Sequence, residues 1–399
     1  MSRSRILKFP PATVDIAKAT ARAAEAAARH ADAVDAEARF PAEAFAVIRE
    51  QRLLSLMIPR ILGGEGASFA EVADVCAQLS KACAATGMVY AMHQIKLSSL
   101  VTHGEESPWH REFMRRIAEG QLLLGSATTE TGIGGDLRNS VCAVEHDADG
   151  RTARLTKDAT VISYALEADA ILVTARKDPA APSSDQVMVV VTRDQYTLDK
   201  TTGWHTLGMR GTCSEGFVLK SEFPVEQIFP SPFAEIAAQS MLACAHLFWS
   251  SIWLGIAYGA MNRAQTFVKG EVRKANGATP LVVQRLAEAD TQLHLMRANV
   301  TDGIARFMAA QKDEAVLNSV GFGAAMLNVK IAASEMVVDI VNRAMLICGI
   351  AGYRTDTPFS LGRYLRDAHS APIMISNNRI YPNLGNMLLV AKLETPLAL

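Results

Sequence analysis

The order in which hydrophobic periodicity changes along the chain constrains the fold more than any other feature of the sequence. Helical spacing fills roughly the first third, short alternating runs typical of strands occupy residues 140–191, and long helical segments return from about Pro232 onward. A doubly wound fold would alternate strands with helices, whereas here the strands stand together between two helical blocks. The sequence therefore predicts a mainly α protein with a central β domain.

The individual segments support this division. Helices are expected at residues 13–29, 41–54 and 69–85. Strands are expected at residues 141–144, 152–155, 170–174 and 186–192, with Asp149-Gly150 as the turn between the first two. We therefore place an N-terminal helical domain at residues 1–124, a middle β domain at 125–231 and a C-terminal helical domain at 232–399.

The composition is that of a globular protein without a strong charge bias. The 399 residues are 49% hydrophobic and 20% charged, and the net charge of −1 gives no reason to expect a nucleic-acid partner. The six cysteines are scattered, with no C-x-x-C pair and no histidine at zinc spacing, so neither a disulfide framework nor a metal site is expected. No signal peptide is expected in residues 1–10, and we predict a cytoplasmic protein.

One stretch, residues 241–260, carries no formal charge and is long enough to cross a membrane. It runs without a break into Asn262, Arg263 and an amphipathic segment, and it contains His246, Ser250 and Ser251. A helix that is buried on all of its sides inside a large or oligomeric protein has the same pattern. We expect a core helix and no membrane span.

The most informative segment is Gly125-Ser-Ala-Thr-Thr-Glu-Thr-Gly-Ile-Gly-Gly-Asp136. Its glycines permit tight turns and let backbone N–H groups approach an anion or a flat ring, and Thr128 and Thr129 add hydroxyls. A dinucleotide-binding loop would have to open a helix, and an alternating β run follows here instead. By its chemistry alone the segment is a glycine loop, for which an ordinary turn is the alternative.

Several segments resemble signatures of the acyl-CoA dehydrogenase family, in that family's order. The first is Thr129-Glu-x-Gly-x-Gly-Gly-Asp136, and the others are Leu207-Gly-Met-Arg-Gly-Thr212, Phe223–Phe229, Glu271–Gly277, and Cys348–Tyr353 followed by Leu365-Arg-Asp-Ala368. The resemblance covers the whole chain. It implies helical N-terminal and C-terminal domains, the latter a four-helix bundle, around a β-barrel or β-sandwich domain.

The resemblance also implies a bound FAD and an assembly of at least two subunits, a homodimer or homotetramer. The residues implied to bind FAD are Ser126, Thr128, Thr129, Gly134, Gly135, Thr160, Val161, Arg273 and Gly349. Arg273 would reach the pyrophosphate of a neighbouring subunit's FAD, for which a guanidinium is well suited. An ordinary solvated arginine is the alternative, because Asn276 replaces the family's usual Phe. Ala159 likewise stands where the family usually has Trp beside the flavin.

The glutamate that serves as the base in acyl-CoA dehydrogenases is missing from both of its usual positions. Ile375 falls about where it would follow Arg-Asp-Ala, and Cys244–Phe248 supplies no carboxylate in the first long C-terminal helix. His93, His246 and His369 remain as candidate catalytic residues. For each of them, a hydrogen-bonded core histidine is the alternative.

Three functions stay open. The first is α,β-dehydrogenation of an acyl thioester, with FAD as acceptor and an electron-transfer flavoprotein downstream. The second is an FAD- or FMN-dependent monooxygenase of the same fold, which takes reduced flavin from a separate flavin reductase and needs no such glutamate. The third is a non-catalytic subunit that completes the FAD site of an active paralogue.

Overall fold

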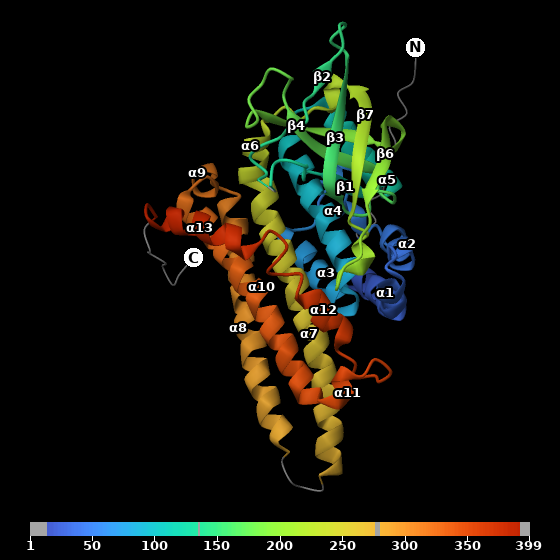
Figure 1. Ribbon diagram of the computed structural model, residues 1–399, viewed down its shortest axis with the longest axis vertical. Helices are drawn as coiled ribbons and strands as arrows, with labels where there is room; N and C mark the ends of the chain where they lie inside the picture. The colour runs from blue at the N-terminus through green and yellow to red at the C-terminus, as the bar shows by residue number, and fades with distance from the viewer. Residues whose placement is uncertain (1–13, 135, 276–279, 392–399) are drawn as a thin grey trace.

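A computed structural model describes residues 14–134, 136–275 and 280–391 (Figure 1). The N-terminal helices are α1 (Ile16–Glu37), α2 (Ala42–Glu50), α3 (Phe69–Ala82), α4 (Ala84–His103) and α5 (Pro108–Gly120). The helix expected at 69–85 is thus two helices, because Cys83 adopts an extended conformation between them. Pro41 precedes α2 as its N-cap residue, and a capping box of Ser68 and Glu71 starts α3.

The middle domain consists of two sheets. One sheet has the order β1 (Leu124–Ala127), β4 (Ala170–Arg176), β5 (Gln186–Thr192), in which β1 and β4 are parallel. The other is antiparallel, in the order β2 (Glu145–His146), β3 (Thr152–Ile162), β7 (Glu215–Pro224), β6 (Tyr196–Thr202). Side chains of both sheets join one hydrophobic core, so the domain is a sandwich.

The strand predictions were right in part. The turn at Asp149-Gly150 joins β2 to β3, and Gly150 has the positive φ of +68° that favours glycine. The run 141–144 forms only an isolated bridge, in which Ala143 pairs with Arg176. Strands β6 and β7 were not predicted. Polar residues on the solvent face interrupt their hydrophobic runs.

The C-terminal domain is helical, as expected. It contains α6 (Phe233–Ile236), a π-helical turn (Ala237–Met241), α7 (Leu242–Lys274), α8 (Leu281–Ala310), α9 (Glu314–Leu317), α10 (Val320–Cys348), α11 (Ile350–Tyr353), α12 (Gly362–Ala368) and α13 (Asn377–Leu388). The three longest, α7, α8 and α10, run side by side away from the β domain (Figure 1).

The uncharged stretch 241–260 forms most of α7, which packs against α3 and α4 as well as α8 and α10. By length and composition alone, the continuous helix Phe233–Lys274 could span a membrane, but 83% of its most apolar window is buried inside the protein. Phe248 and Trp253 are fully buried. The expectation of a core helix is confirmed, and α7 joins the N-terminal and C-terminal domains.

Candidate active site

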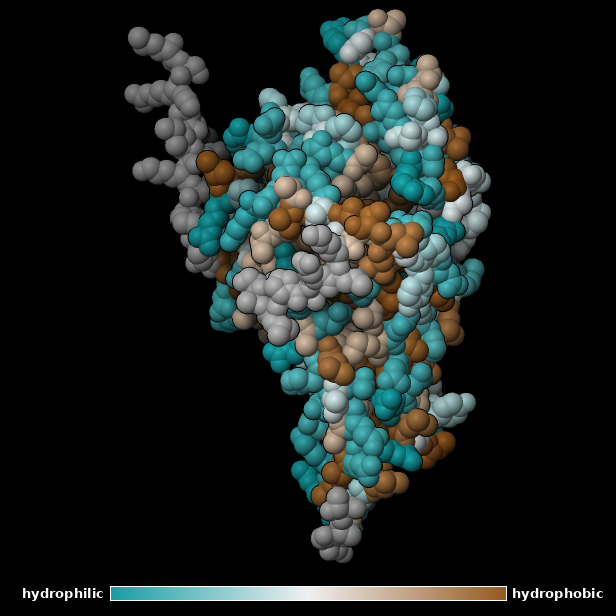
Figure 2. Space-filling model, turned by 90° about the vertical axis from the view of Figure 1, so that its left-hand side faces the viewer, coloured by the Kyte–Doolittle hydropathy of each residue, from teal (hydrophilic) through white to brown (hydrophobic). Residues whose placement is uncertain are grey.

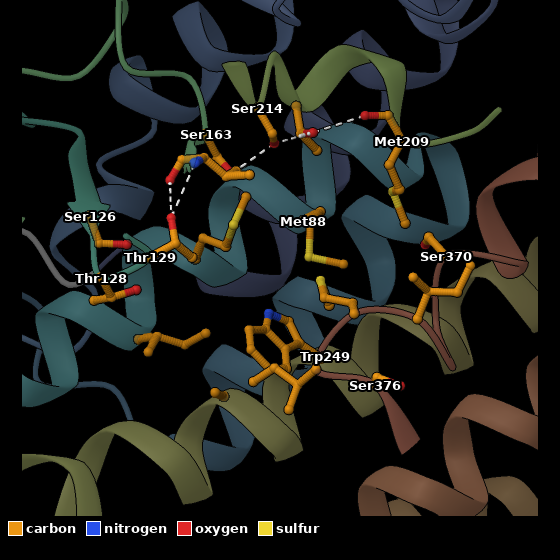
Figure 3. Close-up of a pocket in the computed structure, with 18 of the residues that line it drawn as sticks. Met88, Ser126, Thr128, Thr129, Ser163, Met209, Ser214, Trp249, Ser370 and Ser376 are labelled. Atoms are coloured by element: carbon orange, nitrogen blue, oxygen red, sulfur yellow. Dashed lines mark hydrogen bonds between the residues drawn. The ribbon is translucent and has the colours of Figure 1, made fainter. Parts of the chain in front are cut away.

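A cavity of about 840 Å³ lies where the three domains meet (Figure 3). It is lined by one face of α4, by the segment that follows β1, by the end of β3, by the loop 204–214, by the start of α7, and by residues 366–379. A cavity of this volume suits a cofactor or a drug-sized ligand. It brings together three of the segments that the sequence analysis singled out, the glycine-rich segment, the loop at 207–212 and the stretch after Arg366.

Hydroxyl groups from the glycine-rich segment form one wall. Ser126, Thr128 and Thr129 line the cavity, on the opposite side of the view from Ser370 and Ser376 (Figure 3). The Thr129 hydroxyl donates to the Val161 carbonyl at 2.9 Å and accepts from the Val161 N–H at 3.1 Å, which fixes the segment to β3. The structure thus brings four of the nine predicted flavin-binding residues, Ser126, Thr128, Thr129 and Val161, into one cavity.

A chain of three hydroxyls continues this wall. Thr212 donates to the Met209 carbonyl at 2.9 Å, and Ser214 lies 2.8 Å from both Thr212 and Ser163 (Figure 3). Because the Thr212 proton is committed to a carbonyl, Ser214 donates to Thr212 and Ser163 donates to Ser214. Ser163, which lines the cavity, is therefore left with lone pairs that can accept a hydrogen bond from a ligand.

Glu130, in the middle of the glycine-rich segment, has a structural role. Its carboxylate accepts from Ser140 at 2.8 Å and from the Val141 and Cys142 N–H groups, and it pairs with Lys157 at 3.1 Å. Burial raises the pKa of Glu130, but Lys157 and these hydrogen bonds outweigh it and hold the pKa below its ordinary value. Glu130 anchors the segment and is absent from the cavity lining.

The loop 207–212 and the Arg366-Asp-Ala368 segment, two of the segments that resemble family signatures, pack on each other at another wall of the cavity. The Met209 N–H donates to Asp367 at 2.7 Å, and a Cβ at Gly208 would lie 2.2 Å from the Arg366 carbonyl oxygen, so only glycine fits there. Burial raises the pKa of Asp367 to about 6. Arg366 pairs with Asp35 of α1. The Arg-Asp-Ala segment therefore closes the cavity by holding the loop 207–209 against α1.

Among the residues that the structure describes, no aspartate or glutamate lines the cavity. Ile375 lines it at the position where the family's base was expected, and its φ is +45°, an uncommon value for a β-branched residue. Lys330 holds this conformation by donating to the Ile375 carbonyl at 2.8 Å and to Asn377 Oδ1 at 2.6 Å. Of the other expected position, Cys244–Phe248, Ala245 of α7 lines the cavity.

The three candidate histidines have different surroundings. His93 is buried, with Nε2 at 2.7 Å from the Leu54 carbonyl and Nδ1 accepting from the Leu124 N–H at 3.0 Å, so both nitrogens hold the backbone. Burial lowers the pKa of His93 and of His246 to about 4. Neither residue lines the cavity. His369 does line it and is exposed, so the structure brings only His369 into the site.

Of the remaining predicted flavin-binding residues, those that the structure describes are not among the residues that line this cavity. Thr160 is exposed on β3 beside Val161, and Arg273 is exposed at the end of α7. Gly134 and Gly349 have positive φ values of +58° and +55°, with no neighbouring atom within 4 Å of a Cβ built there. Gly135 and Asn276 lie outside the described residues. The roles proposed for these residues stay predictions.

Sequence reasoning missed most of the residues that line the cavity, and two of them stand out. Lys96 and Trp249 line it from α4 and α7, and the Trp249 Nε1 is buried without a hydrogen-bond partner among the described residues. A lysine within an otherwise almost uncharged helix was the available signal for Lys96, since such residues are rarely buried without a purpose.

The fold defines the class of protein as a three-domain, helix–sandwich–helix protein with a cavity where the domains meet. Models of the acyl-CoA dehydrogenase N-terminal and C-terminal domains match residues 14–121 and 237–376. The chain belongs to the acyl-CoA dehydrogenase superfamily. This confirms the resemblance on which the sequence analysis relied.

Its relatives do not share one activity. The chain is 27% identical over 355 residues to the mitochondrial short-chain specific acyl-CoA dehydrogenase of Bos taurus, covering 87% of this chain and 82% of that one. It is 26% identical over 353 residues to the amino sugar nitrososynthase DnmZ of Streptomyces peucetius, covering 85% and 84%. The structure of FMN-bound TdsC from Paenibacillus sp. A11-2 superimposes with a TM-score of 0.82 at 20% identity, over 96% of this chain and 98% of that one.

Proposed function

We propose that this chain is a flavin-dependent monooxygenase that takes reduced flavin from a separate reductase. The observation that carries the proposal is the cavity without a carboxylate. Proton abstraction next to a thioester needs a positioned base, and a general base contributes typically about 10²–10⁴-fold in rate. Ile375 and the segment Cys244–Phe248, where the family resemblance places that base, supply no carboxylate to the cavity. An oxygenation requires no carboxylate of this kind.

The donor set of the cavity fits a flavin. Ser126 and Thr128 offer hydroxyls from one wall, Ser163 offers an acceptor, and Met88 and Met209 provide apolar surface for a flat ring (Figure 3). A bound reduced flavin supplies two electrons to O2, so that one oxygen atom enters the substrate and the other leaves as water. The residues of this chain position the substrate and exclude bulk water from the reacting groups.

FAD remains our expectation for the flavin, and FMN is the alternative. FAD would need a pyrophosphate site, which Arg273 of a neighbouring copy would complete. An assembly of this kind is supported by exposed apolar side chains near the ends of the bundle, among them Leu346, Ile350 and Tyr353. Figure 2 shows further apolar surface at the height of α9 and α13. The exposed Leu389 directly follows α13 in the chain. We propose a homotetramer or homodimer in the cytoplasm.

The second candidate function is dehydrogenation of an acyl thioester by an unusual base. Two observations favour it, the identity to the short-chain acyl-CoA dehydrogenase and the position of His369 at the cavity. In this reaction the neutral imidazole of His369 would take the α-proton while the flavin accepts the hydride, and an electron-transfer flavoprotein would reoxidise it. His246 is the weaker choice because it does not reach the cavity.

The two candidates separate in one set of measurements. The purified protein is titrated with FAD and with FMN, and the oxidised complex is mixed anaerobically with acyl-CoAs of graded chain length in a stopped-flow instrument. We expect flavin binding without bleaching of the oxidised band. When flavin reduced by a separate reductase is added in air, with small organic compounds in place of the acyl-CoAs, we expect an oxygenated product.

The control is His369→Ala, which removes the candidate catalytic histidine that lines the cavity. Fast bleaching by an acyl-CoA that this variant loses while its flavin stays bound would establish the dehydrogenase. A protein that takes up neither FAD nor FMN would contradict both candidates and leave the non-catalytic subunit.

A further inference from the structure

Lys96 is a buried cation that lines the cavity and has no partner of its own. It lies on α4, about one turn after His93 and one turn before Ser99, and it is only 9% exposed. In the part of the chain that the structure describes, no hydrogen bond or ion pair reaches its Nζ, and burial lowers the pKa of this amine to about 7. A buried lysine is normally paired.

The contacts of α4 place Lys96 between two fixed points. One turn before it, His93 accepts from the Leu124 N–H, where β1 packs on the helix. One turn after it, Ser99 accepts from Ser240 at 3.2 Å, which ties α4 to the π-helical turn Ala237–Met241. Such turns inside helices occur frequently at functional sites. Lys96 therefore stands at the part of the cavity next to the start of α7.

The charges around the cavity are of one sign. Within the described ranges of the chain, its ionisable residues are Lys96, Arg366, His369 and Arg379, and none of these is acidic. Arg366 is already paired with Asp35, and Arg379 and His369 are exposed. Lys96 alone is both buried and uncompensated, a condition that is costly for an ammonium group. A ligand that brings a negative charge into the cavity would remove that cost.

We propose that Lys96 binds the anionic group of a small organic acid, such as a carboxylate, and thereby determines the substrate class. The inference rests on the proposed function, since it names the substrate of that same site. Ser99, one turn further on the same face of α4, adds a hydroxyl to the pocket. A site built around a buried charge rejects a neutral analogue strongly, because binding that analogue leaves the charge unpaired. The anion of a reduced flavin offers the same chemistry, and the experiment separates the two sources.

The test uses butyrate, hexanoate and benzoate as probes, each against its neutral amide. Binding to the flavin-loaded protein is followed by isothermal titration calorimetry and by perturbation of the flavin band. The same titrations on flavin-free protein use calorimetry and tryptophan fluorescence, because Trp204 and Trp249 both line the cavity. We expect each carboxylate to bind at least about 10-fold more tightly than its amide, an effect of about 1.4 kcal/mol.

Substitutions assign this selectivity to one residue. Lys96→Met is expected to abolish it, Lys96→Arg to retain part of it, and Arg379→Gln, which removes the exposed cation of the same cavity, to leave it unchanged. Equal binding of acids and amides by the unchanged protein, or selectivity that survives in Lys96→Met, would overturn the proposal. So would a Lys96→Met variant whose only defect is weaker binding of reduced flavin, because the anion would then belong to the flavin.

Failure of the proposed function has a different signature. A protein that binds no flavin, or that produces no oxygenated product, still reports on Lys96 through the titrations of the flavin-free chain. Conversely, the protein could bind flavin and oxygenate neutral compounds while binding each acid and its amide equally tightly. That result would support the monooxygenase and contradict the role of Lys96.

Discussion

Lys157 in the β domain and Lys96 on α4 are both buried, with exposed fractions of 0% and 9%, but their surroundings are opposite. Lys157 donates to Glu130 at 3.1 Å and to the Thr174 carbonyl at 2.7 Å. Lys96 has neither a carboxylate nor a carbonyl within reach among the described residues. Lys330 resembles Lys157, because it donates to two backbone carbonyls and to Asn377.

The comparison separates two uses of a buried charge. At Lys157 the charge is satisfied within the fold, and it fastens the glycine-rich segment to β3 and β4. At Lys96 the fold leaves the charge unsatisfied, facing a cavity that a ligand can enter. A buried charge that the fold itself does not compensate is a reason to suspect a function, since structural charges are normally paired.

The largest effect is expected from breaking the Glu130–Lys157 pair. Glu130→Gln leaves the Lys157 ammonium buried without its counter-charge. Lys157→Met leaves the Glu130 carboxylate buried without its counter-charge. Each single variant is expected to lower the free energy of unfolding by about 3–5 kcal/mol. Urea denaturation followed by circular dichroism measures it. The double variant Glu130→Gln/Lys157→Met should recover much of the loss, and strictly additive losses would show that the pair is not coupled.

The opposite sign is expected at the other lysine. Lys96→Met replaces an uncompensated buried cation with an apolar side chain of similar length, on a helix that is already apolar. We expect the flavin-free protein to gain about 1–3 kcal/mol in stability at pH 7. The same denaturation experiment checks it, with Lys157→Met as the matched control. A loss of stability in Lys96→Met would mean that the ammonium has a structural partner, and the contrast between the two lysines would collapse.

The pH dependence of that gain follows from the pKa of Lys96, which burial lowers from 10.5 to about 7. Between these values the unfolded chain binds more protons than the folded one, so the stability of the unchanged protein rises with pH across this window. The advantage of Lys96→Met should be complete below about pH 7 and shrink as the pH rises toward 10.5. The other ionisable groups are His93, one turn away on α4, whose pKa is already lowered to about 4, and the cavity residues Arg366, His369 and Arg379.

Thermal unfolding of the two proteins across the range pH 6 to 10 follows this difference directly. A constant difference across the window would indicate that Lys96 is charged, and accommodated, at every pH in the folded protein.

The smallest effect is expected at an exposed lysine. Lys220 pairs with Asp199 at 2.9 Å on the outer face of the second sheet, and both side chains are more than half exposed. Lys220→Met is expected to change stability by no more than about 1 kcal/mol, because water and salt screen such pairs. It is the surface reference for the buried lysines. A loss comparable to that of Lys157→Met would show that burial is not what distinguishes these sites.

Local signals in the sequence determined much of the architecture. Helical and alternating periodicity placed three blocks, the Asp149-Gly150 turn placed the β2–β3 connection, and the lack of charge in 241–260 indicated the core helix α7. The glycine-rich segment led to Ser126, Thr128 and Thr129 because its family pattern is contiguous in the chain. Strands β6 and β7 were not predicted, because solvent-facing polar residues such as Lys220 interrupt their apolar runs.

The tertiary structure alone decided which polar side chains have partners. His93 and His369 looked equivalent as isolated histidines, but backbone groups from Leu54 and Leu124 occupy both nitrogens of one, and the cavity receives the other. Lys96 and Lys157 differ in the same way. Whether a charge is compensated depends on atoms from residues far away in the sequence, as with Lys157 and Thr174, and periodicity along one segment does not report on them. The sequence thus determined the elements of this protein, and the packing between them determined which residues remain free to bind a ligand.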